Sequence, residues 1–466
     1  MKKNQLIRIT ITFIWLFTLV FIPTASVKAA DVNLKSAAIG TGTHVQSSTG
    51  TWTDVDTATA NVNTSTDADD KILVVASFDA KETKAMVGSF RIRDGDSANF
   101  SSEFSRTLSV VRADDSGIGS IVQIFTADNA NDSFTLQHRT TVASMTTSAT
   151  IVAIPLETSF GPLPYGEFTG TTPDSVNSID TWEEVGGNAR TGAVTLGNDA
   201  HIYVAASIEG EQTSGGGDTG SWKLQYSTDS DFLSDVRELG ATCTRLLSVN
   251  GDVGLTGLVG LAQSQPAGNY YFRVMHMGTA TSITTNKVSL VAVGLEDGSH
   301  HLQAWEKTLA SDTTKSTTLE GVTLGSVTFT PDVSSSDLFM HAQYQIGATA
   351  ASLSTYDIFV DKAVDYDTED EDRYLSGSSD VGAGISIGLT SISNTGHTLT
   401  LRHAISDGAQ TLTTSNMVLV GFAMGYDTET PPIPEWPTYL LVGSGMVLVV
   451  VYFWFTRRRT VARQPR

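Results

Sequence analysis

Three acidic segments carry the residue types best suited to chemistry. Each has two aspartates separated by one residue, and the pairs are Asp94/Asp96, Asp229/Asp231 and Asp365/Asp367. Alternating carboxylates in a loop can place several oxygens around one Ca²⁺. The segments lack the glycine and the distal glutamate of an EF-hand loop, so simple solvation is the alternative. Calcium is the one cofactor that the sequence suggests.

A histidine recurs in three strand-like segments, at His138, His276 and His403. Residues two apart in a strand share a face, so His138 shares its face with Leu136 and Phe134. A histidine on such an apolar face is expected to be hydrogen-bonded and structural. Because no second His or Cys accompanies it at ligand spacing, the pattern predicts no zinc site.

Catalytic motifs give no indication of an enzyme. A Gly-x-Ser-x-Gly elbow is absent, and residues 377–379 (Gly-Ser-Ser) are expected to form a loop. No phosphate-binding or dinucleotide-binding loop occurs either. A glycosidase needs two carboxylates facing each other across a cleft, which the acidic loops leave open. We therefore expect a protein that is not an enzyme, with a hydrolase acting on polysaccharide as one alternative.

The aspartate and histidine motifs belong to a series that occurs three times in one order. Its other members are the apolar runs 72–78, 202–208 and 338–344, the Arg-x-Leu-Ser motifs at Arg106, Arg245 and Arg373, the Asp-x-Gly motifs at Asp115, Asp252 and Asp380, and the Thr-Thr-Ser/Asn motifs at Thr146, Thr284 and Thr413. Successive arginines are 139 and 128 residues apart, and successive histidines 138 and 127. The agreement indicates homologous copies that differ mainly in loop length.

Two structural roles follow for the shared motifs. The arginine is expected to clamp a carboxylate or carbonyls at a strand end, and the glycine to permit a tight turn. A tryptophan precedes each apolar run, at Trp52, Trp182 and Trp305, which suggests equivalent positions.

The pattern of each copy predicts an all-β fold of about eight strands. In the first copy they are expected near 51–55, 60–64, 72–78, 87–93, 106–111, 119–126, 133–140 and 149–156. The last strands (151–156, 288–295 and 418–424) are almost wholly apolar, as expected of a central strand covered on both faces. Eight strands in about 130 residues favour a jelly-roll-like β-sandwich, with an immunoglobulin-type sandwich as the alternative.

The resulting organisation is three tandem sandwiches, at 31–160, 161–297 and 298–427. They are expected to lie as beads along a string. The alternative is a pseudo-trimer in which the three equivalent histidines line a shared axis.

Both ends of the chain are predicted from charge and hydropathy. Residues 1–30 have a basic start, an apolar stretch and small residues after Pro23, the pattern of a secretory signal peptide; an uncleaved N-terminal anchor is the alternative. Residues 438–455 are 18 uncharged residues, long enough for a transmembrane helix. Residues 428–437 are a Pro-rich stalk, and the basic tail 456–466 is expected on the cytoplasmic side.

The C-terminal end also carries a motif. Pro434 and Glu435 precede the apolar segment, and Arg457, Arg458 and Arg459 follow it. This tail resembles the sorting signals (PEP-CTERM-like) that exosortases and archaeosortases process, although Trp436 and Pro437 replace the residues that usually follow Pro-Glu. The resemblance implies a sortase-like processing enzyme as a partner, with a permanent membrane anchor as the alternative.

Charge and composition limit the partners. Nine of the 29 basic residues lie in the signal and the tail, which leaves 20 against 50 acidic residues in between. Such a surface repels phosphate backbones and excludes nucleic acid. With a single cysteine, Cys243, the chain must be stabilised by packing rather than by intramolecular disulfides.

The sequence therefore predicts a non-catalytic cell-surface structural or adhesive protein that displays three sandwiches from a membrane anchor, with a surface glycan or protein as ligand. The alternative is a carbohydrate-binding surface protein, for which Trp222, Tyr270 and Tyr271 are the candidate aromatics. Specific binding sites are expected where the copies differ, in residues 209–217 and 361–372.

Overall fold

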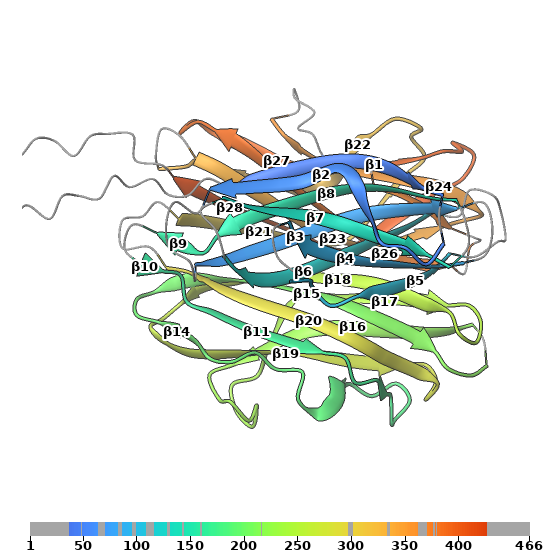
Figure 1. Ribbon diagram of the computed structural model, residues 1–466, viewed down its shortest axis with the longest axis horizontal. Helices are drawn as coiled ribbons and strands as arrows, with labels where there is room; N and C mark the ends of the chain where they lie inside the picture. Colours follow the sequence, from blue (N-terminus) through green and yellow to red (C-terminus); the bar gives the residue numbers. More distant parts are fainter. Residues whose placement is uncertain are drawn as a thin grey trace, which may run out of the picture. The chain divides into compact units, whose positions relative to one another are not determined.

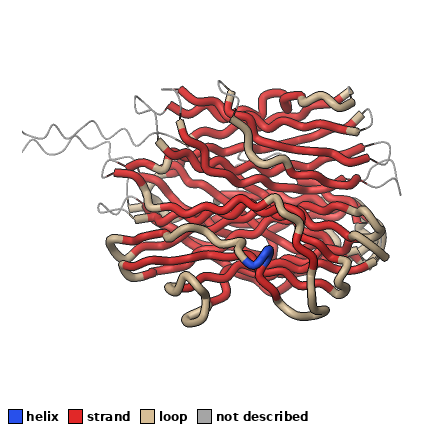
Figure 2. The backbone as a smooth tube through the Cα atoms, turned by 60° about the horizontal axis from the view of Figure 1, so that its bottom comes forward, coloured by secondary structure: helices blue, strands red, loops and turns tan. Residues whose placement is uncertain are grey.

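Antiparallel β-strands make up most of the described chain (Figures 1 and 2). The computed structural model describes residues 37–425 except 48, 64–69, 83–85, 96–98, 109–115, 128–130, 142–143, 159–160, 216, 297–301, 333–335, 362–370, 376–377 and 379. The one helical element in these ranges is a 3₁₀ turn, Val185–Gly187 (η1). The all-β prediction is confirmed.

The predicted signal peptide, stalk, membrane helix and tail lie outside the described residues, and with them Pro434, Glu435, Arg457, Arg458 and Arg459. Within the described ranges, no helix combines the length and the apolar character needed to cross a membrane.

The first copy forms two four-stranded sheets. Its strands are Ala38–Gln46 (β1), Thr53–Asn63 (β2), Lys71–Glu82 (β3), Met86–Asp94 (β4), Phe104–Leu108 (β5), Ser116–Thr126 (β6), Asn131–Thr140 (β7) and Met145–Pro155 (β8). One sheet has the order β1-β8-β3-β6 and the other β2-β7-β4-β5. This is the order of a jelly roll, in which the chain alternates between two facing sheets.

The third copy repeats this order, with the sheets β21-β28-β23-β26 and β22-β27-β24-β25. Its strands are Leu302–Thr314 (β21), Glu320–Phe329 (β22), Ser336–Ala348 (β23), Ser352–Val360 (β24), Glu371–Leu375 (β25), Val381–Ile392 (β26), His397–Ile405 (β27) and Leu412–Gly425 (β28).

The second copy keeps the same six later strands but breaks up the first two. The intact strands are Ala200–Gln212 (β15), Asp218–Ser227 (β16), Arg237–Leu247 (β17), Val253–Gln265 (β18), Gly268–Gly278 (β19) and Ile283–Leu295 (β20). Short pieces replace the rest: Tyr165–Gly170 (β11) and Asp174–Ser175 (β12) pair with β20, while Glu183–Glu184 (β13) and Val194–Leu196 (β14) pair with β19. A small hairpin, Glu157–Thr158 (β9) and Gly161–Pro162 (β10), precedes them.

The strands of the first copy differ from the prediction at its start. Segments 51–55 and 60–64 are one strand, β2, whose pairing with β7 shifts between Asp54 and Thr59. An irregularity of this kind interrupts the alternation of side chains, so one strand looks like two. The true first strand, β1, contains two glycines and two threonines in AIGTGTHVQ, a composition with little β signal.

The last strand of each copy occupies the centre of its sheet. β8 lies between β1 and β3, β20 between β11 and β15, and β28 between β21 and β23. One face of each strand packs into its own sandwich core, and the other joins an apolar cluster to which all three copies contribute. Burial on both faces explains why these strands are almost wholly apolar.

The three sandwiches exchange core residues in a closed cycle. Leu255 of the second copy packs in the core of the first, Ala383 of the third packs in the core of the second, and Ile118 of the first packs in the core of the third. These three residues are equivalent, because they pair with Asp79, Glu209 and Gln345 at one position of β3, β15 and β23.

This cycle corrects the expectation of beads along a string. The described residues from 37 to 425 belong to one compact unit. In each copy, we call the sheet that contains the last strand (β8, β20 or β28) the inner sheet and the other sheet the outer sheet. The inner-sheet strands of different copies lie against one another, as β6 and β15 do in Figure 1. The arrangement is the pseudo-trimer. The equivalent histidines do not line its axis, because they lie on β7, β19 and β27 of the outer sheets. The boundaries 31–160, 161–297 and 298–427 stay predictions.

Side chains of one copy also cap the edge strands of the next. Ser207 Oγ of the second copy accepts a hydrogen bond from the backbone N–H of Val122 at 2.9 Å. Gln343 Oε1 of the third copy accepts one from Val259 N–H at 2.9 Å. Ser207 and Gln343 are equivalent, as are Val122 and Val259. One edge N–H group of β6 and one of β18 are thereby bonded without extension into a larger sheet.

Candidate functional site

The recurrent histidine and the recurrent threonine motif meet in every copy. The His Nδ1 to Thr Oγ1 distance is 2.7 Å for His138 and Thr147, 3.0 Å for His276 and Thr285, and 2.7 Å for His403 and Thr414. All six side chains are buried. The pair links the outer sheet, which carries the histidine, to the inner sheet, which carries the threonine.

The second copy extends this pair into a chain of four polar groups. Trp222 Nε1 donates to Thr285 Oγ1 at 2.9 Å. The threonine proton is therefore directed to His276 Nδ1, and the ring carries its own proton on Nε2. That nitrogen lies 3.2 Å from an oxygen of Asp174. Burial lowers the pKa of His276, and the Asp174 and Glu183 carboxylates oppose the shift.

The other copies vary the same chain. In the third, Tyr356 lies 2.8 Å from Thr414, and Asp312 lies 3.7 Å from His403. In the first, His44 takes the place of the aspartate and lies 2.7 Å from His138. Burial, with a smaller contribution from His44, lowers the pKa of His138 to about 3.

A carboxylate, a histidine and a hydroxyl in sequence resemble a nucleophilic triad in composition. The hydroxyl of Thr285 is nevertheless 1% exposed and His276 is 0% exposed, so a substrate cannot reach the oxygen. Its lone pair is also occupied by the Trp222 indole. The arrangement holds the two sheets together.

The arginine and glycine motifs form a second structural unit. Arg106 Nη1 donates to the carbonyl of Ile118 at 2.6 Å, and Arg245 Nη1 donates to that of Leu255 at 3.0 Å. Each carbonyl thus belongs to the residue that enters a neighbouring core. A clamp on a carbonyl agrees with the expected role of the arginine. In the third copy, the side chain of Arg373 lies outside the described residues.

The role expected for the glycine needs correction. Gly117 and Gly254 lie within strands β6 and β18, not in tight turns. A Cβ on Gly117 would lie 1.9 Å from Arg106 Cζ, and one on Gly254 would lie 2.1 Å from Arg245 Nε. The glycine provides the space that the arginine side chain occupies.

The acidic loops are only partly described. Asp96, Asp365 and Asp367 lie outside the described residues. Asp94 ends β4 and is buried. Asp229 accepts hydrogen bonds from the backbone N–H groups of Asp231 at 3.0 Å and Leu233 at 3.1 Å.

The Asp229 carboxylate therefore organises its own turn. In the part of the chain that the structure describes, no group of three or more His, Cys, Asp or Glu side chains could hold a metal ion. Calcium in these loops stays a prediction.

The three tryptophans are not equivalent. Trp52 and Trp182 each directly precede a residue paired with the recurrent histidine (Thr53 and Glu183), and each stacks beneath a cation, Arg91 and Lys223 respectively. Trp305 instead lies on the inner-sheet strand β21, opposite Gly421, and stacks on Phe329. The expectation that all three tryptophans occupy equivalent positions, which rested on their place upstream of the apolar runs, is therefore wrong for Trp305.

The aromatics proposed for carbohydrate binding are mostly buried. Trp222 is 0% exposed and Tyr270 is 2% exposed, so neither can form a binding platform. Tyr271 is half-buried on β19. Trp222 lies between polar residues in the sequence. That alternation predicts a strand but does not show which face of the strand points into the core.

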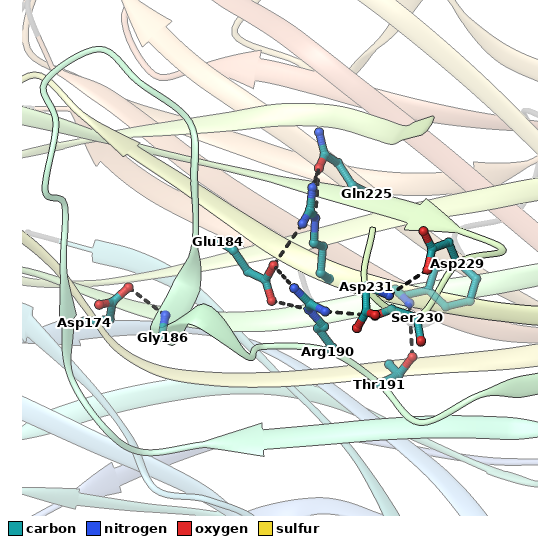
Figure 3. Close-up of polar contacts among 11 residues, drawn as sticks. Asp174, Glu184, Gly186, Arg190, Thr191, Gln225, Asp229, Ser230 and Asp231 are labelled. Atoms are coloured by element: carbon teal, nitrogen blue, oxygen red, sulfur yellow. Dashed lines mark hydrogen bonds and ion pairs between the residues drawn. The ribbon is translucent and has the colours of Figure 1, made fainter. Parts of the chain in front are cut away.

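A copy-specific polar network covers the outer sheet of the second sandwich (Figure 3). Glu184 binds Arg190 through two contacts, of 2.5 and 2.8 Å, and Arg273 at 2.9 Å. Arg273 also donates to Gln225 Oε1 at 2.8 Å, and its guanidinium lies 4.3 Å from the centre of the Phe232 ring. Arg190 reaches the carbonyl of Ser230 at 2.8 Å.

The network stabilises the fold of the second copy. It fastens the broken segment around β13 and the turn at Asp229 to the sheet, and its charges pair with one another. No motif in the sequence predicts this network, because the contributing residues are spread over about 90 positions of the chain.

The variable loops 209–217 and 361–372 are only partly described, and a binding site in them stays a prediction. Glu209 is 3% exposed and accepts a hydrogen bond from the backbone of Ser105 in the first copy. It also lies 3.1 Å from Lys287 Nζ, and burial raises its pKa. Glu209 thus lies at an interface between copies. Most of 361–372 lies outside the described residues.

An open cavity lies where the second and third sandwiches meet. It is a cleft of about 740 Å³, and its lining is Asn198, Asp199, Ala200, His201, Ser264, Leu295, Leu302, Gln303, Ala304, Trp305, Thr330 and Asp332. Volumes of this order suit a small organic ligand. A smaller cleft of about 330 Å³ lies beside η1, between Phe168 and Lys287.

Comparison with known proteins identifies no family. No family model and no curated protein matches the sequence. Among solved structures, Eiger TNF from S. frugiperda is 18% identical over 29% of this chain and 95% of its own, with a TM-score of 0.20. The CBM22-1-CBM22-2 tandem domain from Paenibacillus barcinonensis Xyn10C is 10% identical over 57% and 99%, with a TM-score of 0.17.

PNGase F, a glycosylasparaginase from Flavobacterium meningosepticum, is 9% identical over 56% of this chain and 96% of its own, with a TM-score of 0.26. TM-scores this low carry no argument about function, so the function must be argued from the site.

Proposed function

We propose that the chain is a non-catalytic cell-surface protein with a structural or adhesive role. The observation that carries this proposal is the cyclic exchange of Leu255, Ala383 and Ile118 between sandwich cores. It joins three modules into one unit suited to rigid display. The motifs shared by the copies also stabilise this unit, because the His–Thr pairs and the described Arg–Gly units are buried structural contacts.

Display at the surface depends on the two ends. The signal peptide at 1–30 directs export, and the helix at 438–455 anchors the chain with residues 31–437 outside. A sortase-like enzyme that recognises Pro434 and Glu435 is a proposed partner. Both assignments are supported by sequence pattern alone.

Protease accessibility on intact cells tests this arrangement. The full-length chain would carry one epitope tag after residue 31 and another after Arg466. External protease is expected to remove the first tag and leave the second intact. Protection of both tags on intact cells would overturn the surface location, and early loss of the C-terminal tag with release of the chain would indicate processing.

Calcium in the acidic loops is a separate proposal with its own test. Bound calcium stabilises the folded state in proportion to the logarithm of its concentration over the dissociation constant. Thermal melting in millimolar calcium and in chelator should therefore differ. Identical melting curves would rule out the site.

Carbohydrate binding is the second candidate function. The buried positions of Trp222 and Tyr270 remove the aromatics on which it first rested. The cleft between the second and third sandwiches favours it instead, since Trp305 lines that cleft together with polar side chains.

A further inference from the structure

The cleft between the second and third sandwiches has walls from two copies. One wall comes from the ends of β15, β18 and β20, and includes Asp199 and His201. The other comes from β21 and the segment after β22, and includes Gln303, Trp305 and Asp332. The interfaces of the first sandwich with the second and with the third join equivalent strands. The side chains that line this cleft are not repeated there, because neither β1 nor β11 has a tryptophan at the position of Trp305.

Trp305 offers a supported aromatic surface. Its ring stacks on Phe329 with a centroid separation of 4.3 Å and an interplanar angle of 29°. Phe329 is buried, whereas Trp305 is half-buried. One face of the indole is thus fixed from behind while the side chain lines the cleft. A rigid aromatic ring of this kind gives large contact area at low cost in conformational entropy.

Hydrogen-bond donors and acceptors line the cleft together with the indole. The Gln303 Oε1 accepts from the backbone N–H of Asp332 at 3.1 Å, which leaves its amide N–H groups as donors. Ser264 N–H donates to His201 Nδ1 at 3.2 Å, so the ring proton is on Nε2, a second donor. The carboxylates of Asp199 and Asp332 are acceptors.

The charge of the lining selects among ligands. Asp199 and Asp332 are negative, and no lysine or arginine is among the lining residues in the described ranges. Burial lowers the pKa of His201, so its ring is neutral at pH 7. A carboxylate or phosphate on the ligand would therefore meet repulsion without a compensating cation.

We propose that this cleft binds a neutral oligosaccharide, with the apolar face of one sugar ring on Trp305 and its hydroxyls bonded to Gln303, Asp199 and Asp332. A sugar ring has an apolar C–H face and a rim of hydroxyls that both donate and accept. Those are the two features that the cleft complements. The inference deepens the carbohydrate-binding candidate, and it rests on the proposal of a non-catalytic surface protein.

Binding is favoured over hydrolysis by the exposure of the carboxylates. Asp199 and Asp332 are both exposed. A glycosidase needs one carboxyl kept protonated by its surroundings to act as the acid. Two solvated carboxylates are better suited to accept hydrogen bonds from sugar hydroxyls.

A glycan array with the full-length chain tests the proposal. The protein is kept in a detergent without a sugar headgroup. We expect binding to a subset of neutral glycans and none to sialylated or uronic-acid glycans. Isothermal titration with the best neutral hit then gives the affinity. Failure to bind any neutral glycan, or binding restricted to acidic ones, would overturn the proposal.

Four variants locate the site. Trp305→Ala should weaken binding by roughly tenfold or more, because aromatic anchors dominate such contacts, while Trp305→Phe should retain most of it. The exposed Asp199→Asn should weaken binding without affecting folding. Trp182→Ala is the matched control, since Trp182 is also half-buried but lies on the outer sheet. Equal loss in Trp182→Ala and Trp305→Ala, or no loss in Trp305→Ala and Asp199→Asn, would refute the location.

The same samples distinguish this inference from the proposed function. Release of new reducing ends from the bound glycan would overturn the non-catalytic assignment and leave the cleft as the site. Absence of glycan binding would overturn the cleft proposal and leave the structural role standing.

Discussion

Gly257 gives the sharpest test of the cyclic packing, because it lies where all three copies meet. A Cβ added there would lie 2.3 Å from Ile385 Cγ1 of the third copy and 2.5 Å from Ser120 Oγ of the first. Gly257 pairs with Ser207, Ser120 with Ser77, and Ile385 with Gln343. These are equivalent positions, and the glycine makes room for the larger side chains of the other two copies.

The effect of Gly257→Ala can be estimated from these distances. Carbon atoms in favourable contact are about 3.5 to 4.0 Å apart, so the new methyl group overlaps Ile385 by more than 1 Å. Ile385 is buried and β-branched, and such a side chain has few other rotamers. Overpacking of a core typically costs about 1–3 kcal/mol. The entropic gain on replacing a strand glycine, about 0.5–1 kcal/mol, offsets part of this. We expect a net loss of about 1–2 kcal/mol in the free energy of unfolding.

Urea unfolding followed by tryptophan fluorescence measures this change. Gly347→Ala is the matched control, since Gly347 also lies in an inner-sheet strand, β23, and an added Cβ there meets nothing within 4 Å. It should be neutral or slightly stabilising. If separate sandwiches lay along a string, Gly257 would be equally unobstructed. Equal or higher stability of Gly257→Ala relative to Gly347→Ala would therefore refute the cyclic arrangement.

A double-mutant cycle isolates the contact. Ile385→Ala alone should cost about 2–5 kcal/mol through the cavity it leaves. In the double variant the methyl group at 257 enters that cavity, so the combined loss should be smaller than the sum of the two. Additive losses would show that residues 257 and 385 do not touch.

Three further outcomes are expected in the same unfolding assay. Thr285→Val should lower the free energy of unfolding by about 1–3 kcal/mol, because it leaves His276 Nδ1 and Trp222 Nε1 buried without their partner; Thr195→Val, at an exposed position of β14, is the control. Gly254→Ala should cost about 1–3 kcal/mol by displacing Arg245, and a neutral result would refute the role given to the glycine. Burial lowers the pKa of His341 to about 3, so the unfolded chain binds a proton that the folded chain does not between about pH 6.5 and 3. The stability linked to His341 is present above pH 6.5 and lost as the pH falls. His341→Gln should reduce the slope of unfolding free energy against pH by about 1.4 kcal/mol per pH unit in that window, and an unchanged slope would contradict the burial of this ring.

The sequence predicted the elements that depend on local pattern. Apolar runs such as 72–78 and 418–424 lie in β3 and β28, and the near-continuous burial of β28 reflects its central place in a sheet with both faces covered. Strand β1 was missed because alternating glycine and threonine leave little apolar periodicity. The shift in the pairing of β2 with β7 likewise interrupted the two-residue alternation of side chains by which a strand is recognised.

The candidate site was less predictable, because burial depends on which face of a strand meets which sheet. Trp222 looked like an exposed platform and is a core residue bonded to Thr285. Trp305 looked like a repeat of Trp52 and lines a cleft between two copies instead. Glu209 looked like part of a variable loop and lies at an interface.

Sequence by itself therefore determined the all-β class, the threefold recurrence of motifs and the acidic composition, while the membrane anchor stays a prediction. Each of these follows from residue order and charge, which are properties of the chain. Tertiary structure alone decided that the copies close into a cycle, that the glycine of Asp-x-Gly makes room for an arginine, and that a cleft forms between the second and third sandwiches. The cycle and the cleft depend on contacts between distant parts of the chain, such as Tyr203 with His341, and no local pattern specifies which of many apolar faces will meet. The role of the glycine depends on where the arginine side chain packs, which residue order alone does not show.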